Sequence, residues 1–278
     1  MKSYNKWLLL GIICCWSSMA CAQLQLLPGK EPQCVFAGDA RNIAVVWHNT
    51  GDKTADAEIH MRLYQTSSAT AVQLSEMLWK KLQVLPQQTV IESARLDFPT
   101  VNAETKFLIQ WLKNTNHVIG TTEVLVYPTN LLSELKPLAG EEPLGVLDPQ
   151  NQLKPLLKNS GVDFVDLGNS ELENFPGKLA IVGSFASVVQ VPTGLTKRVE
   201  MLAKKGVAVV WIQPPENGKK LQPSFYLVPE GKGAVVIAQA DLTSDLLENP
   251  ESQLNLIYFC KLALHPQRLT LPDLSLQP

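Results

Sequence analysis

The stretch that decides the fold is Lys178–Gln190, KLAIVGSFASVVQ, in which a short apolar run leads into Gly183-Ser184 and then into a helical region. An uninterrupted apolar run of this length is typical of a strand that is buried on both faces of a sheet. A strand that turns through glycine and serine into a helix is also how many α/β hydrolytic enzymes present a nucleophile. The stretch therefore predicts an α/β fold and makes Ser184 a candidate to be tested.

The sequence around this stretch, from Pro143 onward, alternates short apolar runs with helical stretches, as in a parallel sheet covered on both faces. Leu195–Lys205 has helical periodicity and is expected to stop at Gly206. The pattern predicts a doubly wound, mostly parallel sheet over residues 143–267, followed by a tail at residues 268–278. The expected strands are LGVLDP (144–149), VDFVDL (162–167), KLAIVGS (178–184), VAVVWIQ (207–213) and AVVIAQ (234–239), and the other expected helices are 152–158 and 253–264.

The preceding part, from Cys34 to Tyr127, instead alternates apolar and polar residues with a period of two, for example Ile59, Met61 and Leu63 in AEIHMRLYQ. The strands expected from this pattern are NIAVVWHN (42–49), AEIHMRLYQ (57–65), TVIESARLDFP (89–99), KFLIQWLK (106–113) and TTEVLVYP (121–128). Such alternation is typical of strands with one face in a core and the other in water. LSEMLWKKLQVLP (74–86) has the composition of a helix, but we assign it as a strand because it runs into Pro86 between two strand patterns. These signals predict an antiparallel β-sandwich of immunoglobulin-like kind over residues 23–128. Residues 129–142, with their acids and prolines, are expected to be a linker.

The first residues have the three parts of a secretory signal. Lys2 and Lys6 provide a positive start, Trp7–Trp16 is an apolar run, and Ala20-Cys21-Ala22 supplies small residues for cleavage. We expect residues 1–22 to be a signal peptide that is removed before Gln23, which implies export to the periplasm or the cell exterior.

Two alternatives to cleavage remain at this end of the chain. An uncleaved anchor would need an apolar run of about 20 residues, and this run is much shorter. Lipid attachment to Cys21 is the other alternative, although Ser18 stands where a lipoprotein signal usually has leucine. No other segment of the sequence is apolar enough to cross a membrane.

Charge and cysteine content exclude further classes. Removal of residues 1–22 leaves 22 basic and 26 acidic residues, a net charge of -4. Nucleic-acid binding requires a concentrated basic face, and the basic residues occur only as pairs such as Lys80-Lys81 and Lys204-Lys205. Cys34 and Cys260 lie near opposite ends of the mature chain, so we expect buried thiols and no disulfide framework.

The C-terminal segments GVLDPQNQLKPLLKNSGVDF, LAIVGSF, VEMLAKKGVAVVWIQ and GKGAVVIAQADLTSDLLENPESQLNLIYFCKLAL follow one another in a familiar order. In that order they resemble a class I glutamine amidotransferase-like, flavodoxin-like domain, in the degenerate form found in large exported bacterial proteins and beside glycoside hydrolase modules. The preceding part resembles the immunoglobulin-like β-sandwich that accompanies β-galactosidase-type enzymes. Together the resemblances cover most of the mature chain.

The nucleophile turn of an active domain of this kind resembles G-x-C-x-G, followed later by a histidine and an acid. Here the turn reads Gly183-Ser184-Phe185-Ala186, which has no cysteine and does not match G-x-S-x-G. His265 is the only histidine after this strand, so a triad of Ser184, His265 and an aspartate is the one catalytic alternative left open. The simpler interpretation is that Ser184 is a small residue that lets the chain turn.

Other chemical motifs are also missing from the sequence. The four histidines show no zinc-ligand spacing, and Gly231 and Gly233 flank Lys232 ahead of a strand, where a dinucleotide-binding turn would follow one. The spacing of Asp148, Asp163, Asp166 and Asp241 singles out no glycosidase pair. We therefore expect no metal and no cofactor.

Ligands of open parallel sheets bind beyond the carboxyl ends of the strands. Asp148, Ser184, Gln213 and Gln239 follow or end four of the expected strands and are our candidate ligand-binding residues. Their alternative role is to cap loops and helix starts, where such residues are common.

Two functional hypotheses follow. The first is an exported, non-catalytic binding or scaffold protein of a bacterial envelope system, whose partner is a carbohydrate or another protein. The second is a hydrolase with an unrecognised site at the rim formed by the strand ends.

Overall fold

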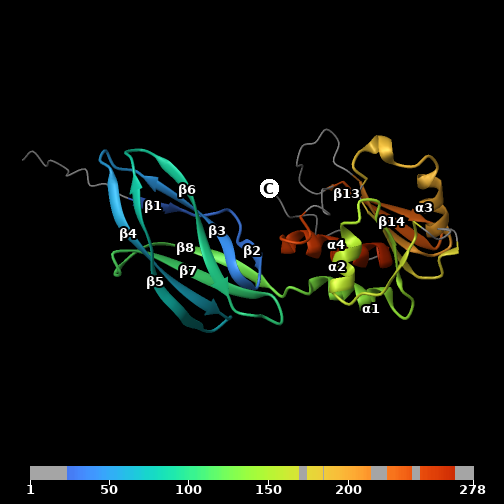
Figure 1. Ribbon diagram of the computed structural model, residues 1–278, viewed down its shortest axis with the longest axis horizontal. Helices are drawn as coiled ribbons and strands as arrows, with labels where there is room; N and C mark the ends of the chain where they lie inside the picture. The colour runs from blue at the N-terminus through green and yellow to red at the C-terminus, as the bar shows by residue number, and fades with distance from the viewer. Residues whose placement is uncertain (1–23, 169–173, 184, 214–223, 240–244, 267–278) are drawn as a thin grey trace, which may run out of the picture.

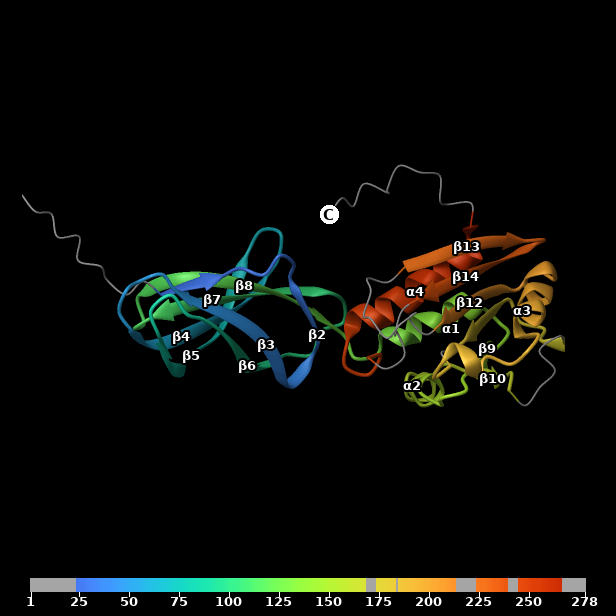
Figure 2. The same ribbon diagram turned by 90° about the horizontal axis from the view of Figure 1, so that it is seen from above.

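A computed structural model of the chain describes residues 24–168, 174–183, 185–213, 224–239 and 245–266. The chain consists of antiparallel and mostly parallel sheets with few helices. Both views of the ribbon place β1–β8 at one end of the long axis and β9–β14 with helices α2–α4 at the other (Figures 1 and 2).

The first eight strands form two sheets that share one hydrophobic core. A three-stranded sheet has the order β1-β3-β6, and a five-stranded sheet has the order β2-β8-β7-β4-β5. All neighbours are antiparallel except β2 and β8. The core cluster draws side chains from both sheets, including Trp47 and Trp111, which are fully buried with ring centroids 5.8 Å apart. The strands are β1 Leu24–Leu27, β2 Gln33–Phe36, β3 Gly38–Asn49, β4 Ala55–Thr66, β5 Ala71–Val84, β6 Thr89–Phe98, β7 Thr105–Lys113 and β8 His117–Tyr127.

The period-two pattern predicted these strands well. Ile59, Met61 and Leu63 of β4 are all buried, as the alternation requires. The assignment of LSEMLWKKLQVLP as a strand is confirmed, because it forms most of β5. The short strands β1 and β2 were missed, since four residues are too few to show a period.

The second part contains a six-stranded sheet with the order β10-β9-β11-β12-β14-β13, in which only β13 is antiparallel to its neighbour. One hydrophobic cluster joins α1, α2 and α4 to one face of the sheet, and another joins α3 to the opposite face. The elements are η1 Leu131–Glu134, α1 Leu135–Ala139, β9 Leu144–Leu147, α2 Leu153–Asn159, β10 Phe164–Asp166, β11 Leu179–Val182, η3 Val188–Gln190, α3 Leu195–Lys204, β12 Ala208–Gln213, β13 Ser224–Glu230, β14 Gly233–Gln239 and α4 Pro250–Leu264.

Two helix ends illustrate how local sequence sets these elements. The predicted stop of α3 at Gly206 is confirmed: Gly206 has a φ of 105°, and its N–H donates to Ala203 O. Helix α4 begins three residues before the expected Gln253, because Asn249 accepts a hydrogen bond from Glu251 N and proline occupies the first turn.

The segment expected to be a linker, residues 129–142, has secondary structure of its own. It forms η1 and α1, and Leu131, Leu132 and Leu135 are buried in the same cluster as α4. Tyr127 at the end of β8 also belongs to this cluster. The prolines and acids of the segment are typical of a linker, but its leucines are spaced for one face of a helix.

Candidate functional site

A cavity of about 390 Å³ lies at the carboxyl ends of β9 and β10, and we call it the carboxyl-edge cavity. Its charged lining consists of Asp148, Lys154, Asp166 and Arg198. Phe185, which follows the turn after β11, and Leu195 at the start of α3 are among its apolar lining residues. The cavity therefore occupies the part of the sheet where the sequence predicted a ligand.

Asp148 is buried at this edge, with 5% of its surface exposed. Its Oδ2 accepts hydrogen bonds from Leu153 N at 2.8 Å and Lys154 N at 3.0 Å. These are free N–H groups of the first turn of α2, where a negative charge is favourable. Asp148 thus has the capping role that was the alternative to ligand binding, although it also lines the cavity.

The neighbouring acid, Asp166, is held in an ion pair. Lys154 Nζ lies 2.7 Å from Asp166 Oδ2, and Gly168 N donates to Asp166 Oδ1 at 2.9 Å. The ammonium group of Lys154, together with the Gly168 N–H, lowers the pKa of Asp166 below its ordinary value. Both carboxylates at this edge therefore accept hydrogen bonds from groups within the protein.

Of the other predicted site residues, Gln213 does not line the cavity. It ends β12 and is the backbone register partner of Gln239 in β14, whose side chain lies outside the description. Ser184 lies outside the described residues. Sequence reasoning missed Lys154 and Arg198, which reach the cavity from α2 and α3. Their position on helices that follow neighbouring strands was the only available signal.

Gly183 is required at this turn for close approach. Its backbone does not have a positive φ, so the turn does not need glycine for its conformation. Its N–H donates to Leu147 O at 2.6 Å, and a Cβ placed on it would lie 3.1 Å from Leu147 O and 3.3 Å from Asp148 Cα. The glycine thus allows the end of β11 to lie against the end of β9.

His265, the histidine of the alternative triad, lies at the other edge of the sheet. It lines a depression together with Lys178, the residue directly before β11, whereas Gly183 directly follows β11. The five residue steps from Lys178 to Gly183 span about 16 Å of extended chain. A histidine at the amino end of β11 is therefore too far from its carboxyl end to act as a base there.

A different kind of surface occurs on β5, which is the edge strand of the five-stranded sheet. Four large apolar side chains of this strand are exposed by 43–58%: Val72, Leu74, Met77 and Leu78. Met77 is the register partner of Met61, and directly opposed residues point to the same face. Met61 is 1% exposed and Met77 is 49% exposed, so the core-facing side of β5 is left uncovered at this edge.

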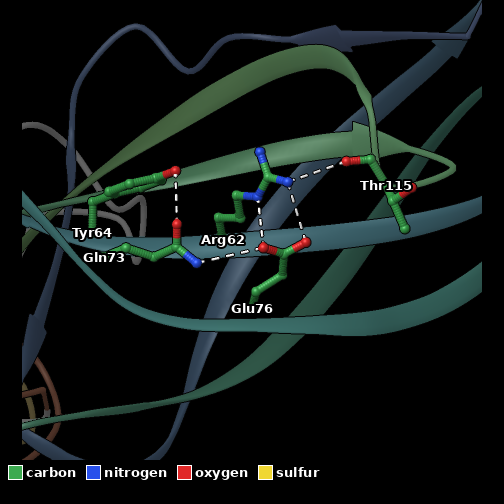
Figure 3. A network of polar contacts seen from close by, with 5 residues as sticks. All are labelled: Arg62, Tyr64, Gln73, Glu76 and Thr115. Carbon is green, nitrogen blue, oxygen red and sulfur yellow. Dashed lines mark hydrogen bonds and ion pairs between the residues drawn. The ribbon is translucent and has the colours of Figure 1, made fainter.

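The outer face of the same segment carries a polar network (Figure 3). Arg62 Nε lies 2.8 Å from Glu76 Oε2, and Arg62 Nη2 also donates to Thr115 O at 3.3 Å. Tyr64 donates to Gln73, which in turn donates to Glu76. This network fixes β5 against β4. Leu78, the register partner of His60, lies on this outer face too, whereas Met77 lies on the core-facing side and stays accessible.

Among the described residues, no group of three or more His, Cys, Asp or Glu side chains is placed to hold a metal ion. The described helices include none with the length and apolar character needed to cross a membrane. Cys34 and Cys260 are both free thiols; Cys260 is buried and Cys34 is half-buried.

Comparisons with known proteins give only distant structural likenesses. No family model and no curated protein matches the chain. Similar solved structures include the alkylpurine DNA glycosylase AlkC of Pseudomonas fluorescens bound to DNA with an abasic site analog, at 11% identity and a TM-score of 0.30, covering 38% of this chain and 31% of that one. They also include a β-glucosidase from Listeria innocua, at 14% identity and a TM-score of 0.28, covering 38% of this chain and 17% of that one. A GH3 β-glucosidase from Bifidobacterium adolescentis is matched at 8% identity and a TM-score of 0.27, with coverage of 38% and 17%. The chain thus spans less than a third of the length of each of these proteins.

Proposed function

We propose that the protein is an exported, non-catalytic binding or scaffold component of a bacterial envelope system. In this proposal residues 1–22 are the export signal, β1–β8 are an immunoglobulin-like sandwich, and the remainder is a flavodoxin-like domain resembling a degenerate amidotransferase. The strand order β10-β9-β11-β12-β14, numbered along the chain, matches the 2-1-3-4-5 order of flavodoxin-like sheets, which supports this assignment.

The observation that carries the proposal is the use made of the acids at the carboxyl-edge cavity. Asp148 caps α2, and Asp166 is paired with Lys154. The described lining of this cavity contains no histidine or cysteine. A hydrolytic site needs a nucleophile within hydrogen-bond reach of a base, and the described side chains provide no such pair at this edge.

The uncovered face of β5 supports a protein as the partner. Apolar residues clustered on a free edge strand are a common means of protein recognition, because a partner segment gains backbone hydrogen bonds and apolar contact together. A scaffold protein requires a surface of this kind. The polar network on the outer face keeps β5 in register without occupying that surface.

The test begins with the exported protein. We expect mass spectrometry to find a chain that starts at Gln23; an intact Met1 or a lipid on Cys21 would contradict the export scheme. The purified protein is then screened for esterase and amidase turnover, together with the Ser184→Ala variant. We expect no turnover from either. Turnover that Ser184→Ala abolishes without a change in melting temperature would establish the hydrolase instead.

The binding surface is tested separately by crosslinking in the native envelope. We expect the wild type to give a specific crosslinked product from a photoreactive residue at position 72. Met77→Lys should abolish that product while leaving the melting temperature unchanged, because this side chain is half exposed. Lys113→Gln, on β7 of the same sheet, is the control and should leave the product intact. A product that survives Met77→Lys would argue against β5 as the surface.

A further inference from the structure

A second depression, of about 380 Å³, lies at the opposite edge of the parallel sheet, and we call it the amino-edge depression. Its charged or titratable lining residues are Lys178, Lys232 and His265, and no acidic residue among those the structure describes lines it. This composition is unusual for a chain whose acidic residues outnumber its basic ones. The depression is also remote from the carboxyl-edge cavity, because the strands run from one edge to the other.

Lys232 is held at this place by the Gly231-Lys232-Gly233 turn that joins β13 to β14. Glu230 and Gly233 are register partners, so the hairpin loop has two residues, and Gly231 at its first position has a φ of 62°. Positive φ at that position is a requirement of type II′ hairpin turns. Both glycines lie against the end of α3: a Cβ on Gly231 would be 3.0 Å from Lys204 Cα, and one on Gly233 would be 2.4 Å from Val207 O. Close packing against the end of α3 therefore holds the turn in place, and Lys232 lies at its tip.

Lys178 reaches the depression from the residue before β11. Gly140, which ends α1, has a φ of 82°, and a Cβ at that position would lie 2.8 Å from Lys178 Nζ. Because Gly140 has no side chain, there is room beside it for the ammonium group of Lys178. The two lysines come from segments far apart in sequence, and backbone turns that require glycine position both.

Within the part of the chain that the structure describes, the side chains of Lys178 and Lys232 take part in no ion pair or hydrogen bond. Lysines near helix C-termini often serve to offset the partial negative charge of the last carbonyl groups. Helices α3 and α4 do end at this edge, but Lys178 and Lys232 donate to none of the described carbonyls. Both ammonium groups therefore keep their hydrogen-bonding capacity with respect to the described residues.

We propose that the amino-edge depression binds a small molecule through a phosphate or sulfate monoester group. Two ammonium groups in a concave site are suited to a tetrahedral oxyanion, to which lysine binds as a compact charge with three donors. The volume lies at the lower end of the range for small-molecule sites, about 300–1,000 Å³. A membrane surface or a nucleic acid would instead need a broad basic face.

The experiment uses the full mature chain and three probes: inorganic phosphate, sulfate and glucose 6-phosphate. Binding is measured by calorimetry and by amide shifts in a heteronuclear NMR titration at moderate salt. We expect saturable binding with shifts at Gly206 and Gly233. The Lys178→Gln, Lys232→Gln double variant should weaken binding by about tenfold or more, as expected for the loss of charge-assisted hydrogen bonds.

The matched control replaces two exposed lysines elsewhere, Lys30→Gln and Lys197→Gln, which changes the net charge equally. It should bind as the wild type does. Equal weakening in both double variants, or no saturable binding of any probe, would overturn the proposal. Binding to vesicles of anionic phospholipid without binding of the free probes would also overturn it, in favour of a membrane-facing role. A melting curve for each variant ensures that folded proteins are compared.

Discussion

The two edges of the parallel sheet differ in how their charges are used. At the carboxyl edge, Asp148 and Asp166 are both satisfied by partners within the protein. At the amino edge, Lys178 and Lys232 line a depression without a partner among the described residues. A polar residue at the expected place in a fold is therefore not by itself a binding residue. Its remaining hydrogen-bonding capacity decides whether it is available to a ligand.

The largest expected effect on stability comes from a substitution at the amino edge of the sheet. Gly233→Ala would place a Cβ 2.4 Å from Val207 O and 2.7 Å from Ala203 O, both of which are backbone atoms that cannot rotate away. We expect a loss of about 3 kcal/mol in the free energy of unfolding, as for a severe overpacking change. Chemical denaturation measures this loss.

Gly161→Ala is the matched control, because that glycine has a φ of 68° but nothing within 4 Å of its Cβ position. It should cost only about 1 kcal/mol, through backbone strain alone. Equal losses for the two variants would contradict the close-packing explanation for the turn.

The next effect tests whether Asp148 is structural. Asp148→Ala leaves the N–H groups of Leu153 and Lys154 without their acceptor and should cost about 2 kcal/mol. Asp148→Asn keeps an oxygen acceptor and should cost about 1 kcal/mol. If Asp148→Ala were as stable as the wild type, the aspartate would be free for a ligand and the contrast between the edges would fail.

A smaller effect compares the two residues of the turn after β11. Gly183→Ala must move backbone atoms of Leu147 or Asp148 by a few tenths of an ångström, and we expect a cost of about 1–2 kcal/mol. Ser184→Ala removes one hydroxyl group and should cost about 1 kcal/mol or less. Thermal melts of both variants provide the order. A larger loss for Ser184→Ala would mean that the hydroxyl group has a role the glycine packing does not explain.

The smallest effect concerns the Lys154–Asp166 ion pair. Because the pKa of Asp166 is lowered in the folded protein, its stabilisation is present above the ordinary carboxyl pKa and is lost as the pH falls through the lowered value. At neutral pH the Asp166→Asn variant should be less stable by about 0.5 kcal/mol, in the range of partly exposed pairs. The difference should disappear in acid. A difference that grew as the pH fell would have the wrong sign for this pair.

Much of the fold was predictable because it depends on local periodicity. Alternation identified β3, β4, β6, β7 and β8, and apolar runs identified the four longer parallel or buried strands of the second sheet. The short helices within residues 129–142 were not predicted, because their leucines are buried by contacts with α4 that are distant in sequence. Likewise β13, an edge strand with Pro229, has no pattern that distinguishes it from a loop.

The candidate site was predictable only in its position. The sequence by itself determined that Asp148 follows a buried strand and that Gly231-Lys232-Gly233 precedes one, because both statements depend on neighbours along the chain. The hydrogen bonds from the first turn of α2 to the carboxylate of Asp148 became visible only in the tertiary structure. The same holds for the depression that Lys178 and Lys232 share with His265. The physical reason is that hydrogen-bond partners and charge neighbours are set by distances through space, across segments that the sequence separates by tens of residues.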